Sequence, residues 1–308
     1  MVISKKVVVL GSVHMDLVAT AARLPGVGES VAGGVFSKSP GGKAGYQAVQ
    51  FAKAGADVEV LSRLGDDDFG RELRRGLAAQ GVGVSLIATD NAHSTGASTI
   101  FAADGDYQSI IAPGAAALLS TADLEHARSS IEAADALVLQ LELPVDISER
   151  AAGVAKAAGR AVILNVSPVP ESVPNELVSL ASIIVVNRVE AGRLLGKDFA
   201  DADLAPLAIR LGVRTLIVTL GAGGSMAWHE GLIVRQPAFK VAIADTTVGA
   251  GDSFLAATSV GLLEGLPIDK ALARGAAAGA ITVSRPGGYD ALPARDEIDR
   301  FLADAPYT

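Results

Sequence analysis

Residues 161–221 contain three apolar runs in succession: AVILNVS (161–167), IIVVN (183–187) and TLIVTLG (215–221). Each run is almost continuously hydrophobic rather than alternating, as expected for strands that are buried on both faces. Helical spacing over 204–212 separates the second run from the third. Strands that alternate with helices in this way indicate parallel strands joined by crossover helices.

The same rhythm extends to the rest of the chain. Further strand-like runs are VVVLG (7–11), VEVLSRLG (58–65) and ALVLQLE (136–142). Mostly alanine-rich segments with helical spacing accompany them at 45–55, 71–81, 120–133, 147–159, 252–264, 268–284 and 297–303. We therefore predict an α/β fold with a mainly parallel central sheet flanked by helices.

Two stretches, about 13–36 and about 94–112, interrupt this rhythm. They combine short strand-like runs with turn residues such as Pro25-Gly26. We interpret them as insertions that form one small β-sheet, a lid. Because no linker, repeat or low-complexity tract divides the chain, residues 1–308 are expected to form a single domain. The strand edges of the lid can pair with a second copy, so we expect a homodimer through the lid.

Composition excludes several classes of protein. A net charge of −8 disfavours binding to nucleic acid or to an anionic membrane, since phosphate contact normally demands a cationic face. The absence of cysteine excludes disulfides, thiolate catalysis and cysteine-ligated metals. No apolar segment has the length of a signal peptide core or a membrane span. We expect a cytoplasmic protein that acts on a small molecule.

The segment TTVGAGDSF (246–254) is the first candidate for chemistry. Small residues lead into Asp252 at the start of an alanine-rich helix. Free N–H groups of a glycine turn, reinforced by the helix N-terminus, can hold a phosphate or its developing charge. Asp252 would lie beside that anion hole, within reach of a hydroxyl that it could deprotonate. The alternative is an ordinary N-cap, because Asp is a favoured capping residue.

Two other glycine-rich segments suit a close approach of the backbone to a ligand. PGGKAG (40–45) is not a Walker A loop, because Ala44 replaces the required Ser or Thr. TLGAGG (219–224) fails the GxGxxG spacing, because Met226 occupies the last glycine position. A mononucleotide contact remains open for the second segment. A plain loop and a simple hairpin are the respective alternatives.

Polar residues follow several predicted strands, at the edge where open parallel sheets bind ligands. They are Asp16, Glu142, Asn187 and Glu190. Asp16 is placed to accept hydrogen bonds from sugar hydroxyls. The four histidines lack zinc-ligand spacing, and the Gly65-Asp66-Asp67-Asp68 run is interpreted as a solvated turn rather than a metal site.

Taken in order, these segments resemble the ribokinase family of carbohydrate kinases, also called the PfkB family. The resemblance runs nearly end to end through GSVHMD, PGGKAGYQA, SRLGDDDFG, QLELP, NVSP, NRVEA, TLGAGGS, DTTVGAGDSF and SRPGG. It implies an α/β core with a β-lid. It also implies transfer of the γ-phosphate of ATP, with Mg²⁺, to a hydroxyl of a small sugar.

The resemblance also implies roles for individual residues. Asp252 is the expected catalytic base, with Gly249, Ala250 and Gly251 as the anion hole. The expected substrate contacts are His14, Asp16, Gly41, Gly42, Lys43, Tyr46 and Glu142. The expected nucleotide contacts are Asn187, Thr219, Gly221, Gly223, Gly224 and Gly251, with Glu190 acting indirectly on Mg²⁺. A monovalent cation, K⁺, is expected near Asp245, Thr282, Arg285 and Gly287.

The chain departs from the family pattern at the substrate and cation sites. The family commonly has Asn where this chain has His14 and Tyr46, so an imidazole and a phenol replace two amides. Asp245 lies seven residues before Asp252, where ribokinases have six. One alternative function is a nucleoside kinase, with Tyr46 or His14 against a base. The other is a catalytically silent sugar-binding regulator, against which the intact glycine turn and Asp252 count.

Overall fold

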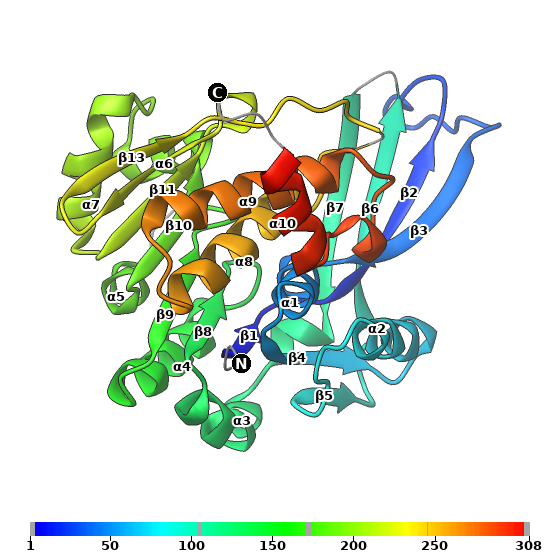
Figure 1. Ribbon diagram of the computed structural model, residues 1–308. Helices are drawn as coiled ribbons and strands as arrows, with labels where there is room; N and C mark the ends of the chain where they lie inside the picture. The colour runs from blue at the N-terminus through cyan, green and yellow to red at the C-terminus, as the bar shows by residue number, and fades with distance from the viewer. Residues whose placement is uncertain (1–3, 104–105, 171–173, 245, 305–308) are drawn as a thin grey trace.

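The computed structural model describes residues 4–103, 106–170, 174–244 and 246–304, which fold into two sheets and the helices around them (Figure 1). The strands are β1 (Lys6–Leu10), β2 (His14–Thr20), β3 (Val35–Gly41), β4 (Asp57–Gly65), β5 (Ile87–Asp90), β6 (Thr95–Ala103), β7 (Asp106–Gly114), β8 (Ala136–Leu139), β9 (Ala161–Asn165), β10 (Ile183–Asn187), β11 (Thr215–Thr219), β12 (Ser225–His229) and β13 (Leu232–Gln236). The helices are α1 (Lys43–Lys53), α2 (Asp68–Ala79), α3 (Thr121–Ala133), α4 (Val145–Ala157), α5 (Asn175–Leu180), α6 (Arg188–Leu195), α7 (Leu204–Leu211), α8 (Ala250–Leu263), α9 (Ile268–Val283) and α10 (Arg295–Asp304).

The central sheet confirms the predicted parallel core. Its nine strands lie in the order β13-β12-β11-β10-β9-β8-β1-β4-β5. All neighbours from β11 to β5 are parallel. Only the pairs β11–β12 and β12–β13 are antiparallel, with β12 and β13 forming a hairpin at one edge. The carboxyl ends of the parallel strands therefore meet along one edge, where ligands bind in sheets of this kind.

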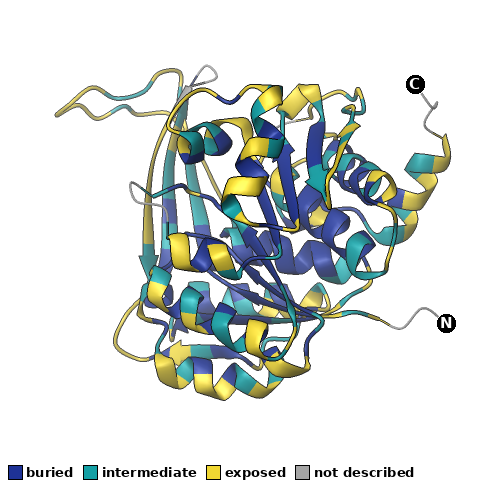
Figure 2. Cartoon of the chain, turned by 90° about the vertical axis from the view of Figure 1, so that its left-hand side faces the viewer, coloured by how far each residue is buried: buried dark blue, intermediate teal, exposed yellow. Residues whose placement is uncertain are grey.

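The strands are apolar on both faces because helices cover both. Val7 and Val9 of β1 pack in the cluster that contains side chains of α1, α8 and α9. Val8 and Leu10 point the other way, into the cluster formed with α3, α4 and α7. Figure 2 shows the strands and the inner faces of the helices buried, with the outer faces exposed. No described helix is long and apolar enough to cross a membrane.

A separate four-stranded sheet, β3-β2-β6-β7, confirms the predicted lid and stands at the right of Figure 1. β3 reaches beyond the predicted segment 13–36, because it continues to Gly41. His14 lies opposite Gly41, and Asp16 lies opposite Ser39, in the antiparallel pair of β2 and β3. This pairing brings the end of GSVHMD against the start of PGGKAG and places both at the entry to α1.

Candidate active site

The site begins with the glycine turn that precedes α8. Gly249 is the N-cap residue of α8 and has a φ of 81°, a conformation that side chains disfavour. A Cβ at this position would lie 2.9 Å from Cδ1 of Tyr46, so the Tyr46 ring packs directly on the turn. The first amide N–H groups of α8 have no intrahelical partner and carry the positive end of the helix dipole. This geometry suits an anion.

Asp252 lies in the first turn of α8, half-buried beside this anion-binding turn. Burial raises the pKa of the Asp252 carboxyl above its usual range. The ammonium of Lys43 and a hydrogen bond from Gln47 act in the opposite direction. A carboxyl with a raised pKa is suited to take a proton from a hydroxyl.

Lys43 is the cation that faces Asp252 from the start of α1. Burial acts against the charged form of Lys43. The carboxylates of Asp252, Glu142 and Glu190 outweigh that effect and raise the pKa of the Lys43 ammonium. These four residues come from separate motifs of the sequence, and the fold brings their charges within reach of one another.

Three amides that the sequence analysis did not identify support Asp252. Nε2 of Gln47 donates to Oδ1 of Asp252 at 2.8 Å and to Oδ1 of Asn165 at 3.2 Å. Nε2 of Gln140 donates to Oε1 of Gln47 at 2.6 Å. Gln140 and Asn165 are the first polar residues in the apolar runs ALVLQLE and AVILNVS, which is the signal that could have found them.

Asp16 and His14 project from β2 on the lid side of the site. Nε2 of His14 lies 3.3 Å from Oδ1 of Asp16, while the buried Nδ1 of His14 has no hydrogen-bond partner. A Cβ at Gly41 would lie 2.5 Å from the Asp16 carboxylate, so only glycine leaves room there. Gly42 has a φ of 85° and also approaches the backbone of Ser12.

Glu142 is fixed in place after β8. Its Oε2 accepts a hydrogen bond from the backbone N–H of Lys43 at 3.0 Å and another from the hydroxyl of Ser12. Ser12 is a further residue that the sequence analysis missed, although it lies within GSVHMD. These bonds tie the first turn of α1 to the carboxyl ends of β1 and β8.

Tyr289, from the short 3₁₀ turn η4 (Tyr289–Ala291), completes one wall of the site and was also missed. Its ring packs edge-to-face on Tyr46, with centroids 5.3 Å apart. The buried Tyr289 hydroxyl has no hydrogen-bond partner. Its oxygen lies where a Cβ of Gly45 would point, 2.1 Å away. Burial raises the pKa of both tyrosines, so both are neutral donors.

A cavity of about 450 Å³ lies on the other side of the α8 turn. Thr219, Gly221 and Gly224 line one part of it, and Ala250 and Gly251 line another. Phe239, Phe254 and Val283 contribute much of its apolar lining. The cavity therefore offers apolar walls to a flat group and backbone amides to an anion, which suits a nucleotide. Gly223 belongs to the same turn, η3 (Gly221–Gly223), but does not line the cavity.

The comparisons with known proteins decide the family. The model of the pfkB family carbohydrate kinases matches residues 4–295. The chain belongs to the pfkB family of carbohydrate kinases. Ribokinase from Haemophilus influenzae is 35% identical over 306 residues, covering 98% of this chain and 99% of that protein. Ribokinase from Bacillus subtilis is 31% identical over 299 residues, covering 97% and 100%.

A solved structure agrees with the fold of this carbohydrate kinase. Arabidopsis thaliana ribokinase, complexed with ribose and ATP, superposes with a TM-score of 0.89 at 30% identity. The superposition covers 98% of this chain and 100% of that one. The family, the fold and the activity class predicted from the sequence, an ATP-dependent sugar kinase, are thereby confirmed.

Asn187 and Glu190 of the kinase form a capping box at the start of α6. Oδ1 of Asn187 accepts from the backbone N–H of Glu190 at 2.8 Å, and Oε2 of Glu190 accepts from the backbone N–H of Asn187 at 2.7 Å. Both side chains thus have a structural partner. The charge of Glu190 still acts on Asp252 and Lys43.

The side chains of Thr282 and Arg285, two residues expected near the K⁺ site, have partners within the protein. Asp245 lies outside the described residues. The Thr282 hydroxyl donates to Ala278 O at 2.8 Å and lies 3.0 Å from Oγ of Ser253. Arg285 pairs with Glu297 at 2.5 Å. A Cβ at Gly287 would lie 2.9 Å from the methyl group of Thr246, so this glycine permits close packing.

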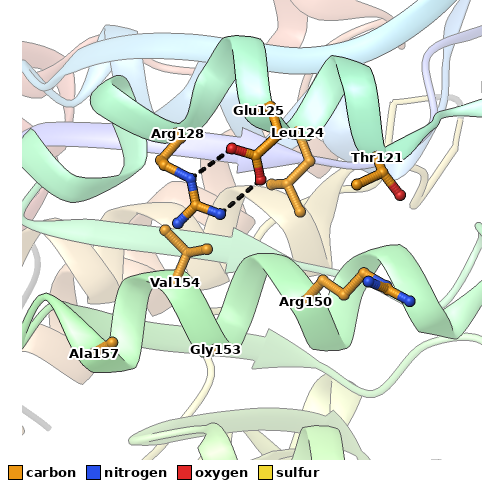
Figure 3. Close-up of a pocket in the computed structure, with 8 residues that line it drawn as sticks. All are labelled: Thr121, Leu124, Glu125, Arg128, Arg150, Gly153, Val154 and Ala157. Carbon is orange, nitrogen blue, oxygen red and sulfur yellow. Dashed lines mark hydrogen bonds and ion pairs between the residues drawn. The ribbon is translucent and has the colours of Figure 1, made fainter.

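A second hollow of about 370 Å³ lies between α3 and α4, on the helical layer of the kinase (Figure 3). Arg128, one of its lining residues, is already paired with Glu125 at 2.6 Å. None of its eight lining residues belongs to the predicted site. The glycine turn at α8 therefore remains the candidate active site.

Proposed function

We propose that Asp252 is the base that activates a sugar hydroxyl for attack on the γ-phosphate of ATP. Asp252 would take the hydroxyl proton as the sugar oxygen bonds to the γ-phosphorus. The bond from that phosphorus to the β,γ-bridging oxygen breaks, and ADP leaves. The observation that supports this proposal is the place of Asp252, between the polar residues near the lid and the cavity behind the α8 turn.

We propose matching roles for the groups around Asp252. The turn of Gly249, Ala250 and Gly251 would stabilise the transferring phosphoryl group with its backbone N–H donors, and Lys43 would add a positive charge. Asp16 and Glu142 would hold sugar hydroxyls, with Gly41 and Gly42 leaving room for the ring. The cavity lined by Thr219, Gly221 and Gly224 would take the nucleotide, with Asn187 and Gly223 at its rim.

Mg²⁺ would neutralise the phosphate charge that develops during transfer. The carboxylates of Asp252, Glu142 and Glu190 fit such an ion, because Mg²⁺ usually keeps several waters and binds through phosphates and one or two carboxylates. Among the described residues no group of three or more acidic or histidine side chains could hold a metal alone. Glu190 would therefore act on the ion through water, since one of its oxygens already accepts a backbone N–H.

Activation by K⁺ is a separate proposal. The Thr282 hydroxyl is engaged and Arg285 is itself a cation, so main-chain carbonyls near Thr282, Arg285 and Gly287 would have to hold K⁺. A higher kcat in KCl than in NaCl at equal ionic strength would support the proposal. Equal rates in the two salts would refute it.

The acceptor is proposed to be a small sugar other than ribose. The relatives are named ribokinases, but His14, Tyr46 and Tyr289 give this chain an aromatic wall with two unpartnered polar atoms, His14 Nδ1 and the Tyr289 hydroxyl. Buried polar atoms of this kind are costly unless a ligand pairs with them. The pocket would therefore select an acceptor that supplies those hydrogen bonds.

We also propose that the lid and the core act as one domain and that the lid carries a homodimer interface. Phe36, Phe101 and Ile110 on the lid are 66%, 40% and 72% exposed. An exposed apolar surface of this kind on a sheet favours association. Analytical ultracentrifugation tests the proposal, and a monomer at micromolar concentration would refute it.

We further propose a cytoplasmic location, where ATP is available to the enzyme.

A coupled assay for ADP, run with a panel of sugars and nucleosides, tests the function. Turnover that depends on a sugar supports the proposal. Turnover only with nucleosides would identify a nucleoside kinase instead. No turnover with any acceptor, together with sugar binding by calorimetry, would indicate the silent regulator.

A further inference from the structure

Three amides, two of them buried, meet behind Asp252, and none of them belongs to the substrate or nucleotide contacts proposed above. Gln47 comes from α1, Gln140 follows β8, and Asn165 ends β9. Gln47 has no exposed surface and Gln140 is 2% exposed. Amide groups buried this deeply are costly unless their hydrogen bonds are satisfied. Their arrangement therefore needs a physical reason.

The direction of every hydrogen bond in this group is set by one backbone carbonyl. The oxygen of Val185 can only accept, so Asn165 must turn its Nδ2 toward it, at 3.1 Å. Oδ1 of Asn165 then faces Gln47 and requires a donor, which Nε2 of Gln47 supplies at 3.2 Å.

The same logic fixes the other side of Gln47. Its Nε2 faces Asn165 and Asp252, so its Oε1 must point toward Gln140, whose Nε2 donates at 2.6 Å. Flipping Gln47 would set its oxygen against the oxygens of Asn165 and Asp252. Gln140 and Asn165 thus hold Gln47 with its N–H directed at Oδ1 of Asp252, at 2.8 Å.

We propose that Gln47, oriented by Gln140 and Asn165, is a positioning residue that fixes the rotamer of Asp252 and stabilises its carboxylate. Because Oδ1 accepts from Gln47, Oδ2 is assigned to the substrate proton. A bond to a carboxylate is stronger than one between neutral groups, so the donor favours the charged form that a base requires.

Other charged groups also affect the ionisation of Asp252. Lys43, from α1, also favours the carboxylate, whereas Glu142, after β8, and Glu190, from α6, oppose it. Burial opposes the carboxylate most. The Gln47 bond therefore acts with Lys43 against three effects of opposite sign, and its loss should raise the pKa of Asp252.

Gln47→Met tests the proposal, because methionine keeps the volume and removes the donor. We expect kcat to fall roughly 10- to 100-fold, as for a misplaced catalytic group, with the KM for ATP unchanged. The acid limb of the pH–rate profile should move to higher pH, because an Asp252 that protonates more readily loses activity earlier as the pH falls. Gln140→Met, one bond further away, should shift the limb in the same direction by less.

Gln50→Met is the matched control. Gln50 lies on the same helix and is equally buried, but it bonds to Pro293 O at 3.0 Å and to the Ser253 hydroxyl at 3.1 Å. A wild-type acid limb in folded Gln47→Met, or an equal shift in Gln50→Met, would overturn the proposal.

The proposal rests on Asp252 being the base, and a second readout separates the two. NMR titration of the Asp252 carboxyl carbon, without substrates, reports its pKa directly in wild type, Gln47→Met and Gln140→Met. An unshifted titration in both variants refutes the role of Gln47, whatever the activity. Retained turnover in Asp252→Asn, with a shifted titration, refutes the proposed base while leaving the effect of Gln47 on Asp252 established.

Discussion

Replacing Asp252 with Asn should lower activity and raise stability together. The exchange removes the carboxylate and keeps the shape, because Oδ1 of Asn can still accept the 2.8 Å hydrogen bond from Gln47. Only the ability to take a proton and the negative charge are lost. We expect kcat to fall roughly 10²–10⁴-fold, the range for a lost general base, which corresponds to about 3–5 kcal/mol of barrier.

The sign of the stability change follows from the pKa. Burial raises the pKa of Asp252 in the folded protein. A group with a raised folded pKa contributes stability that is complete below its unfolded pKa, about 3.9, and is lost as the pH rises through the folded pKa. At neutral pH the wild-type protein therefore carries this charge at a cost, and Asn does not. The Asn variant should melt at a higher temperature at neutral pH, with the difference vanishing below about pH 4.

Two measurements on one preparation check this prediction: turnover in a coupled ADP assay, and thermal unfolding without ligands across pH. Asp146→Asn is the matched control, because Asp146 lies in the first turn of α4 and is exposed. Its loss removes only a helix-dipole contribution of about 0.3–1 kcal/mol and should not raise stability. Near wild-type turnover in Asp252→Asn would exclude the base. A lower melting temperature at neutral pH would show that our account of its buried charge is wrong.

Three further predictions concern the acceptor pocket. Asp16→Ala should weaken sugar binding by about 1.5–3 kcal/mol for each lost charge-assisted hydrogen bond, and unchanged sugar affinity by calorimetry would exclude this contact. The double change His14→Asn with Tyr46→Asn should raise kcat/KM for ribose at least about ten-fold relative to the best panel substrate, because pockets built around hydrogen bonds discriminate strongly. An unchanged ratio, or a wild-type preference for ribose, would remove both residues as determinants. Tyr289→Phe should stabilise the free protein, since an unpaired buried hydroxyl costs about 1–3 kcal/mol, and should weaken sugar binding; melting curves and calorimetry measure the two effects, and a destabilised variant with full sugar affinity would contradict the assignment.

The central sheet could be predicted because its strands carry their own signal. Runs such as IIVVN are buried on both faces of the sheet. A strand buried on both faces has a nearly continuous apolar sequence, which can be recognised without the structure. The short elements at the margins lacked that signal. Helix α6 was not predicted, because Asn187 and Glu190 were interpreted as ligand contacts after a strand, whereas the structure shows them capping the helix. Three-residue spacing of Asn and Glu fits both interpretations.

The glycine turn with Asp252 could be predicted because its residues are adjacent in the chain. The amide group around Gln47 could not, because Gln47 is 205 residues from Asp252 and 93 from Gln140. The sequence pattern around a buried glutamine in a helix does not indicate which residue it bonds to. Only the fold shows that Gln140 and Asn165 bond to Gln47 and that Gln47 bonds to the carboxylate of Asp252.

The packing of the aromatic wall shows why Tyr46, which departs from the family pattern, must be considered together with its neighbours. The Tyr46 ring lies against Gly249, and the Tyr289 hydroxyl lies where a side chain of Gly45 would be. Each large residue thus depends on a glycine from another segment, and the two rings pack on each other. Gly249 serves two purposes, because its positive φ shapes the anion-binding turn and its missing Cβ admits Tyr46. The pocket proposed to select the acceptor and the turn proposed to hold the phosphoryl group therefore share Gly249. Replacing Tyr46 with a smaller residue, without other changes, would leave a void beneath the turn.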